Sequence, residues 1–196
     1  MKTFAIAALL SAATGAVAQT PAKQSAPFNL IVNGGKYKNE KLTACHEGAA
    51  IEGLCVGYGG SEFRLNTTTG YTAAPGNSQP GHLTYSLPVN GPNGGSESEA
   101  MTFYYEPYTD VALPLFEPAY PNVVVEFDQN KRMNVPAYID DTVTPPKAGN
   151  YYPIYRWYVC ETYYTGYTYS TLAWKLGSGR PQNPSCVKVD VTQKFI

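Results

Sequence analysis

The sequence predicts an all-β protein, which we expect to form an antiparallel β-sandwich, jelly-roll-like or a partly open barrel. Sixteen prolines and eighteen glycines interrupt the chain every few residues, which leaves room for strands but little for amphipathic helices. The segments between them are rich in Val, Thr, Tyr and Phe, which suit a pleated, half-buried surface. Four cysteines add the expectation of a disulfide-stapled fold.

Eight segments combine these residue types, and several of them alternate between apolar and polar side chains. Leu83, Tyr85 and Leu87 share one face of their segment, and Val187 and Val191 share one face of another. One apolar and one polar face is typical of antiparallel sheets packed together. The expected strands lie near residues 28–32, 62–66, 82–87, 102–105, 122–128, 155–164, 167–176 and 187–195.

The two tyrosine-rich segments near residues 155–164 and 167–176 predict a hairpin with a defined register. A two-residue turn at Thr165-Gly166 would set Tyr164 opposite Tyr167. Counting outward from that turn places Trp157 opposite Trp174.

The N-terminal residues resemble a secretory signal peptide. Lys2 supplies a positive charge, Phe4–Leu10 a short apolar stretch, and Ala16-Val17-Ala18 the small residues before a cleavage site. The apolar stretch is shorter than the roughly 20 residues that span a bilayer. We therefore expect a protein that is secreted or lodged in the cell wall. The expected parts are a signal peptide at 1–18, a flexible segment at 19–27 and a single domain at 28–196.

The even number of cysteines predicts two disulfides, for which the sequence permits three pairings. We favour Cys45–Cys55 and Cys160–Cys186, because local loops are the easier to close. A zinc site is the alternative, but no two cysteines have the C-x-x-C spacing and the chain has only two histidines. We expect no metal and no cofactor.

The charges exclude some classes of partner. The chain has 14 Lys and Arg against 15 Asp and Glu, and its longest basic run is Lys131-Arg132. Nucleic acids and anionic membranes attract clustered basic residues, which this chain lacks. We expect a cell-wall glycan or a host surface receptor as partner.

Glu126 and Asp128 are the strongest catalytic candidates. Residues two apart on a strand share a face, and paired carboxylates can act as acid and nucleophile in glycoside hydrolysis. However, Asn130 stands where a third acid would extend the ladder, and Val125 and Phe127 form the apolar face. We therefore expect both carboxylates to face water.

Tyrosine is the most unusual feature of the composition. Seventeen tyrosines are present, eight of them between residues 151 and 169. Aromatic faces near polar groups suit stacking on sugar rings and also protein interfaces, although tyrosines also simply tile β-sheets. The candidate binding residues are Tyr155, Trp157, Tyr163, Tyr164, Tyr167 and Tyr169.

The remaining motifs are weaker. His46 and His82 lack the nucleophile of a serine triad, and we expect both to be ordinary loop or strand residues. Asp140-Asp141, with Asp110, offers oxygen ligands for calcium, although a solvated turn explains the pair better. Asn66 begins the only usable glycosylation sequon, Asn-Thr-Thr.

Three strings resemble a group of secreted ascomycete proteins of unknown function. They are Cys45–Cys55 (CHEGAAIEGLC), Arg156–Cys160 (RWYVC) and Pro181–Cys186 (PQNPSC). The resemblance implies a fungal source, secretion, a β-sandwich and two local disulfides, with no catalytic residues to carry over. Small secreted ascomycete proteins of this kind include cell-wall components and apoplastic proteins that provoke plant cell death. The RWYVC string and the aromatic strands after it also resemble the Alternaria major-allergen β-barrel.

Together these features predict a non-catalytic secreted fungal protein, extracellular or attached to the cell wall, which acts as an effector or elicitor of host cell death. The alternative is a carbohydrate-binding module, or a glycoside hydrolase that uses Glu126 and Asp128.

Overall fold

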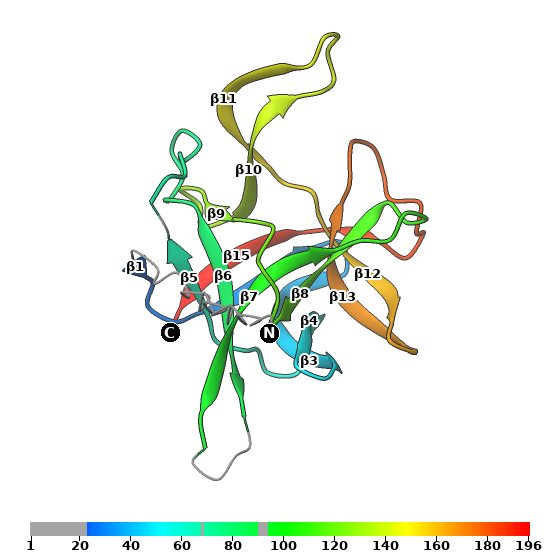
Figure 1. Cartoon of the computed structure of the whole chain (residues 1–196). Helices are drawn as coiled ribbons and strands as arrows, with labels where there is room; N and C mark the ends of the chain where they lie inside the picture. The colour runs from blue at the N-terminus through cyan, green and yellow to red at the C-terminus, as the bar shows by residue number, and fades with distance from the viewer. Residues whose placement is uncertain (1–22, 68, 90–93) are drawn as a thin grey trace, which may run out of the picture.

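The computed structural model describes residues 23–67, 69–89 and 94–196, so the expected signal peptide lies outside the described residues. All the regular secondary structure of these residues is β-strand (Figure 1). Twelve of the strands form one large sheet. They are β1 Lys23–Gln24, β2 Phe28–Gly34, β3 Tyr37–Gly48, β4 Ile51–Val56, β5 Phe63–Thr67, β6 Gly81–Pro88, β7 Ser96–Tyr104, β8 Val111–Glu117, β12 Trp157–Tyr164, β13 Tyr167–Lys175, β14 Val187–Lys188 and β15 Asp190–Phe195. A small sheet holds β9 Glu126–Phe127, β10 Met133–Asp140 and β11 Lys147–Ile154.

The large sheet closes on itself as an eight-stranded antiparallel barrel. The strands follow the order β2-β3-β4-β13-β8-β7-β6-β5, and β5 returns to β2 where Phe63 pairs with Phe28. The predicted all-β antiparallel class is confirmed. The main sheet is not clearly a sandwich, because the backbone hydrogen bonds continue around the ring instead of stopping at the edges of two facing sheets.

The other strands extend the barrel. β15 pairs with β2, β1 with β5, β12 with β13, and β14 with β12. Lys23–Gln24, within the segment expected to be flexible, is thus the strand β1. The β10–β11 hairpin projects from the body of the molecule, and we call it the arm (Figure 1).

The core fills the barrel with side chains from nearly every strand. Phe63 stacks on Phe116 at 5.6 Å between ring centroids, and Trp157 meets Trp174 edge to face at 4.7 Å. Trp157 also donates its indole N–H to the carbonyl of Met133 at 2.9 Å, which ties the small sheet to the barrel. A second, smaller apolar cluster lies outside the barrel, around Val111, Leu113, Leu115, Cys160 and Ala173.

The tyrosine hairpin has the predicted register. Tyr164 pairs with Tyr167 and Trp157 with Trp174 across β12 and β13. Both residues of the two-residue turn have positive φ, 47° at Thr165 and 95° at Gly166. This backbone twist matches that of the strands it joins.

The expected set lacked six strands: β1, β3, β4, β8, β10 and β11. β3 is largely polar, and its residues 38–41 are exposed, so no alternation marks it. β8 is buried along nearly its whole length and contains Pro114, a residue that normally lies at sheet edges. Strands buried on both faces lose the period of two on which the prediction depends.

Both predicted disulfides are present, Cys45–Cys55 with Cα atoms 5.7 Å apart and Cys160–Cys186 with Cα atoms 4.1 Å apart. The first joins the neighbouring strands β3 and β4, and the second fixes the loop after β13 to β12. Disulfides of this kind persist in oxidising compartments. None of the described residues belongs to a helix that is long and apolar enough to cross a membrane.

Candidate binding site

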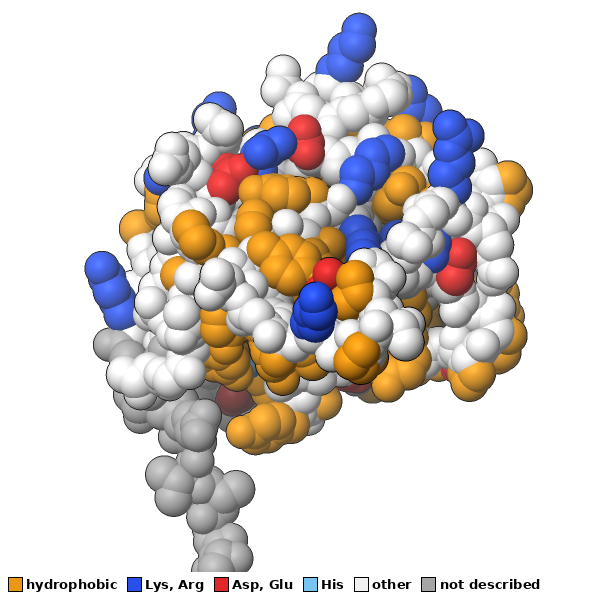
Figure 2. Space-filling view, turned by 90° about the horizontal axis from the view of Figure 1, so that it is seen from above, with side chains coloured by type: hydrophobic (Ala, Val, Ile, Leu, Met, Phe, Trp, Pro, Cys, Tyr) orange, Lys and Arg blue, Asp and Glu red, His pale blue; other side chains and the backbone are white. Residues whose placement is uncertain are grey.

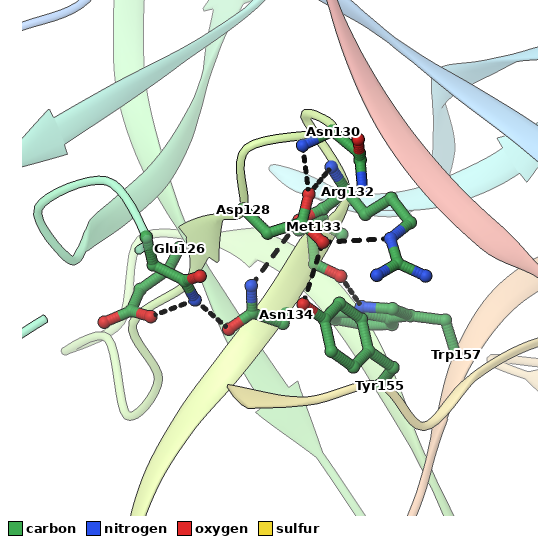
Figure 3. Close-up of polar contacts among 9 residues, drawn as sticks. Glu126, Asp128, Asn130, Arg132, Met133, Asn134, Tyr155 and Trp157 are labelled. Atoms are coloured by element: carbon green, nitrogen blue, oxygen red, sulfur yellow. Dashed lines mark hydrogen bonds and ion pairs between the residues drawn. The ribbon is translucent and has the colours of Figure 1, made fainter. Parts of the chain in front are cut away.

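Glu126 is completely buried, which corrects the expectation that it faces water. Its two carboxylate oxygens accept hydrogen bonds from the backbone N–H of Ala74 at 2.9 Å and the side-chain amide of Asn77 at 2.6 Å. Asn77 also bonds to the side-chain oxygen of Asn134 at 3.1 Å (Figure 3). Burial raises the pKa of Glu126, and the hydrogen bonds from Asn77 and Ala74 only partly offset it. The carboxylate thus holds the 70–80 loop on the small sheet.

Asp128 is also engaged within the protein, so the expectation of a solvated carboxylate does not hold for it either. It accepts bonds from the guanidinium of Arg132 and the hydroxyl of Tyr155, each at 2.9 Å. Burial raises the pKa of Asp128, but the bonds from Arg132 and Tyr155 outweigh it and leave the pKa below its ordinary value. Figure 3 shows the carboxylates of Glu126 and Asp128 pointing to different partners.

The six candidate aromatic residues separate into three groups. Trp157 is buried in the core, and Tyr155 is half-buried against Arg132, whose guanidinium carbon lies 4.7 Å from the ring centroid. Tyr164 packs against Tyr104 with ring centroids 5.1 Å apart. The other three lie around the tip of the hairpin and line two separate cavities; they are Tyr163, Tyr167 and Tyr169.

The cavity beside Tyr163 has a volume of about 320 Å³, and we call it the tyrosine cavity. The β7–β8 loop, β12 and the loop after β13 meet there. Three of its tyrosine side chains are well exposed, 62% at Tyr105, 78% at Tyr108 and 73% at Tyr163. Its other lining residues are Tyr104, Glu106, Thr109, Asp110, Val111, Leu113, Glu161, Thr162, Gln182 and Asn183.

Specific contacts hold the walls of the tyrosine cavity in place. Asp110 accepts the backbone N–H of Gln182 at 3.1 Å and forms an ion pair with the buried amine of Lys175 at 3.3 Å. The Gln182 amide donates to the carbonyl of Tyr108, and the Asn183 amide to the carbonyl of Glu161. These bonds join both loops to β12, so the cavity is largely preformed, as small-ligand sites usually are.

Within the cavity, Tyr104 and Glu106 form a charge-assisted pair. The hydroxyl of Tyr104 donates to the carboxylate of Glu106. This bond is the main reason that the pKa of Tyr104 rises to about 12, and burial adds to it. The phenol therefore stays neutral and keeps Glu106 oriented in the wall of the cavity.

Most residues of the tyrosine cavity were not predicted from the sequence as binding residues. Only Tyr163 belonged to the candidate binding residues. The run Tyr104-Tyr105-Glu106-Pro107-Tyr108 carried a usable signal, because three tyrosines around a proline are more than a short loop needs for packing. This run lies next to the loop after β13 because β8 pairs with β13. That pairing could not be predicted, since the sequence of β8 did not mark it as a strand.

A family model covers residues 25–195 of the chain and describes a domain of unknown function, DUF7907. The chain belongs to this family. The matched residues span the barrel, the arm and both disulfides. No curated protein and no solved structure matches the chain.

A second cleft of the DUF7907 domain lies on the other cavity-lining tyrosines, Tyr167 and Tyr169, and has a volume of about 550 Å³. His46 and Glu47 form its opposite side. Glu47 is only 3% exposed, and burial, reinforced by the charge of Glu52, raises the pKa of Glu47 to about 7.

The described part of the DUF7907 domain brings together one group of three possible metal ligands. Cys45, Glu47 and Cys55 place possible ligand atoms within 4.8 Å of one another, but both sulfurs are consumed by the disulfide. His46 instead lies 3.2 Å from Glu52. Asp140 accepts bonds from Thr142 in a local turn, which is the solvated-turn alternative.

Two further sequence expectations concern the surface of the DUF7907 domain. On the face shown in Figure 2, the Lys and Arg side chains are spread out and do not form one patch. Asn66 lies on β5, next to β1, and its side-chain oxygen accepts a bond from Gln24 at 2.9 Å. Its glycosylation remains a prediction.

Proposed function

We propose that this DUF7907 protein is a non-catalytic, secreted protein that binds cell-wall glycan in the tyrosine cavity. The observation that carries the proposal is the grouping of exposed tyrosine rings with fixed amide and carboxyl groups in one preformed hollow. Flat aromatic rings offer stacking surfaces for the apolar faces of sugars, and the polar groups satisfy their hydroxyls. The disulfides and the signal-like N-terminus support an extracellular location.

A polysaccharide panel tests the proposal through binding and hydrolysis measured together. Replacing Tyr163 or Tyr108 by Ala should weaken binding about tenfold, because each ring supplies roughly 1–1.5 kcal/mol of stacking. Tyr120→Ala is the matched control, since Tyr120 is 86% exposed and does not line the cavity. The proposal fails if the wild-type protein binds no glycan, or if the control loses as much affinity.

The hydrolase alternative receives little support from the positions of Glu126 and Asp128, because each is bonded within the protein. Hydrolysis by the wild-type protein that disappears in Glu126→Gln, with folding intact, would revive this alternative. Binding without hydrolysis favours the proposed non-catalytic function.

A second candidate function is recognition by a host surface receptor, and the arm is the observation that favours it. Tyr138, Ile139 and Tyr152 remain 39–49% exposed on this projecting hairpin. Exposed aromatic and aliphatic residues on a projecting element suit a protein interface. Infiltration of the pure protein into leaves tests this candidate: cell death that is lost in a variant with Ser at all three positions, but kept in Tyr163→Ala, would assign the response to the arm.

A further inference from the structure

The charges in the tyrosine cavity are one-sided. Glu106, Asp110 and Glu161 contribute carboxylates, whereas no lysine or arginine lies among the residues that line the cavity. The three acids come from two different elements, the β7–β8 loop and β12. Any ligand that enters is therefore surrounded by negative charge and by the electron-rich faces of tyrosines.

Among the described residues, only one of these carboxylates is paired with a cation. Asp110 is paired with Lys175. Glu106 accepts the hydroxyl of Tyr104, which orients its charge without cancelling it. The backbone of Glu161 forms hydrogen bonds with the side chains of Asn183 and Ser185. Its carboxylate forms no hydrogen bond or ion pair with the described residues. Two negative charges thus remain for a ligand.

The same walls provide a second kind of attraction for a cation. Tyr105, Tyr108 and Tyr163 are exposed beside these acids, and a cation near a tyrosine face gains roughly 0.5–2 kcal/mol. Anionic sugars, by contrast, would meet two uncompensated carboxylates. Rings and acids together favour a positively charged ligand over a neutral one.

We propose that the ligand of the tyrosine cavity is an amino sugar chain with free ammonium groups, held by Glu106 and Glu161 and stacked on Tyr163. This inference rests on the proposed glycan-binding function and names the class of glycan. The ammonium group lies between the carboxylates, and the ring face rests on the tyrosine.

Calorimetric titration with two oligomers of equal length tests the inference. One is a β-1,4-linked glucosamine tetramer, and the other is its fully N-acetylated, neutral counterpart. Both titrations are run at about pH 5.5. The free-amine tetramer should bind more tightly by about tenfold, and added salt should reduce the difference.

Single substitutions locate the charge effect. Glu161→Gln should weaken binding of the free-amine tetramer roughly threefold to fivefold, as expected for a partly exposed ion pair, and leave the acetylated tetramer unaffected. Glu40→Gln is the matched control, because Glu40 is exposed on β3. This substitution removes the same charge at a position away from the cavity. Tyr163→Ala should weaken both tetramers.

The outcomes separate the two proposals. If neither tetramer nor any other glycan binds, the proposed function fails. If the acetylated tetramer binds as well as the free-amine one and Glu161→Gln has no effect, the inference is wrong while the proposed function stands. An equal loss in Glu40→Gln would also overturn it, since the attraction would then be long-range. Competition by spermine at equal concentration would show that charge without a sugar ring suffices, which contradicts an amino sugar.

Discussion

At the scale of single residues, buried carboxyl groups make the stability of this protein depend on pH. Glu47, Glu52, Glu99 and Glu126 are each at most 5% exposed. One oxygen of Glu99 has no hydrogen-bond partner among the described residues, and burial raises the pKa of Glu99, as the charge of Glu52 does. A carboxylate that is buried without a cation favours its protonated form. Proton binding is therefore coupled to folding at several positions.

Glu47 makes this coupling measurable. Its pKa of about 7 exceeds the ordinary value of 4.5, so the folded protein holds this proton more tightly than the unfolded chain. The contribution of Glu47 to stability is thus full below about pH 4.5 and is lost as the pH rises to about 7, by up to about 3 kcal/mol. Glu47→Gln should remove this loss and be the more stable protein at pH 8.

Urea unfolding at several pH values checks this prediction through the difference between variant and wild type. Exposed Glu40, replaced by Gln, is the control and should show no such pH-dependent difference. A constant difference between pH 4 and pH 8 for Glu47→Gln would mean that Glu47 titrates normally.

Replacing Glu126 should have the opposite effect on stability, because both oxygens of its carboxyl group accept hydrogen bonds. Glu126→Ala leaves the N–H of Ala74 without its acceptor, removes one of the two acceptors of the Asn77 amide and opens a cavity. We expect a loss of about 2–4 kcal/mol in unfolding free energy, measured by urea denaturation. Asp141→Ala, on an exposed turn, should change it by less than about 0.5 kcal/mol. Equal effects of the two substitutions would contradict a structural role for Glu126.

The fate of Glu126 shows where the sequence stops being informative. Alternation correctly indicated that Phe127 is buried, but it also placed Glu126 in water. The partners that compensate its burial come from a loop 49 and 52 residues away in sequence. Such a contact depends on tertiary packing, and no local pattern marks it.

At the scale of elements, the β12–β13 hairpin is the one that the sequence specifies best. The register of β12 and β13 followed from a turn of two residues, because each strand alternates and the turn length fixes the pairing. β8 shows the contrary case, since burial on both faces and Pro114 conceal it. With β8 unrecognised, the loop beside it had no position, and the tyrosine cavity could not be predicted.

The turn itself can be tested. Gly166 has φ of 95°, and a Cβ added there would meet no atom within 4 Å, so a substitution acts only through the backbone. Gly166→Ala should destabilise the protein by about 1 kcal/mol. Gly149 also has free space for a Cβ but an ordinary φ, so Gly149→Ala is the matched control and should be neutral or slightly stabilising. Thermal unfolding of both variants compares them; the same decrease in Tm for both would exclude the backbone explanation.

At the scale of the whole molecule, we expect a division of roles between the two disulfides: both stabilise the fold, and only one fixes a wall of the tyrosine cavity. Cys45–Cys55 closes a short loop within a hairpin, whereas Cys160–Cys186 closes a longer one that carries the wall of the tyrosine cavity. The class of fold and the pairing of the cysteines could be predicted, because both depend on local spacing. Closure of the barrel could not, since it depends on β5 meeting β2.

Replacing each cysteine pair by serines should separate these roles. Loop-closure entropy predicts losses of about 2.7 kcal/mol for the 10-residue separation and about 3.5 kcal/mol for the 26-residue separation. Glycan affinity should fall only when Cys160–Cys186 is removed, because that bond holds the loop of Gln182 and Asn183. Urea unfolding and titration with the bound glycan measure the two effects. Equal loss of affinity in both variants would contradict the division.

The pairing of β2 with β15 brings the two ends of the domain together, since Phe28 lies opposite Phe195. A short linker between these ends would make a circular permutant, with new termini opened in the β6–β7 connection at Gly94-Gly95. The permutation converts the β2–β15 pairing into a local hairpin, and the β6–β7 hairpin becomes the pairing between the ends of the new chain. Because every strand pairing is retained, we expect the permutant to form the same barrel although its synthesis begins at a different strand.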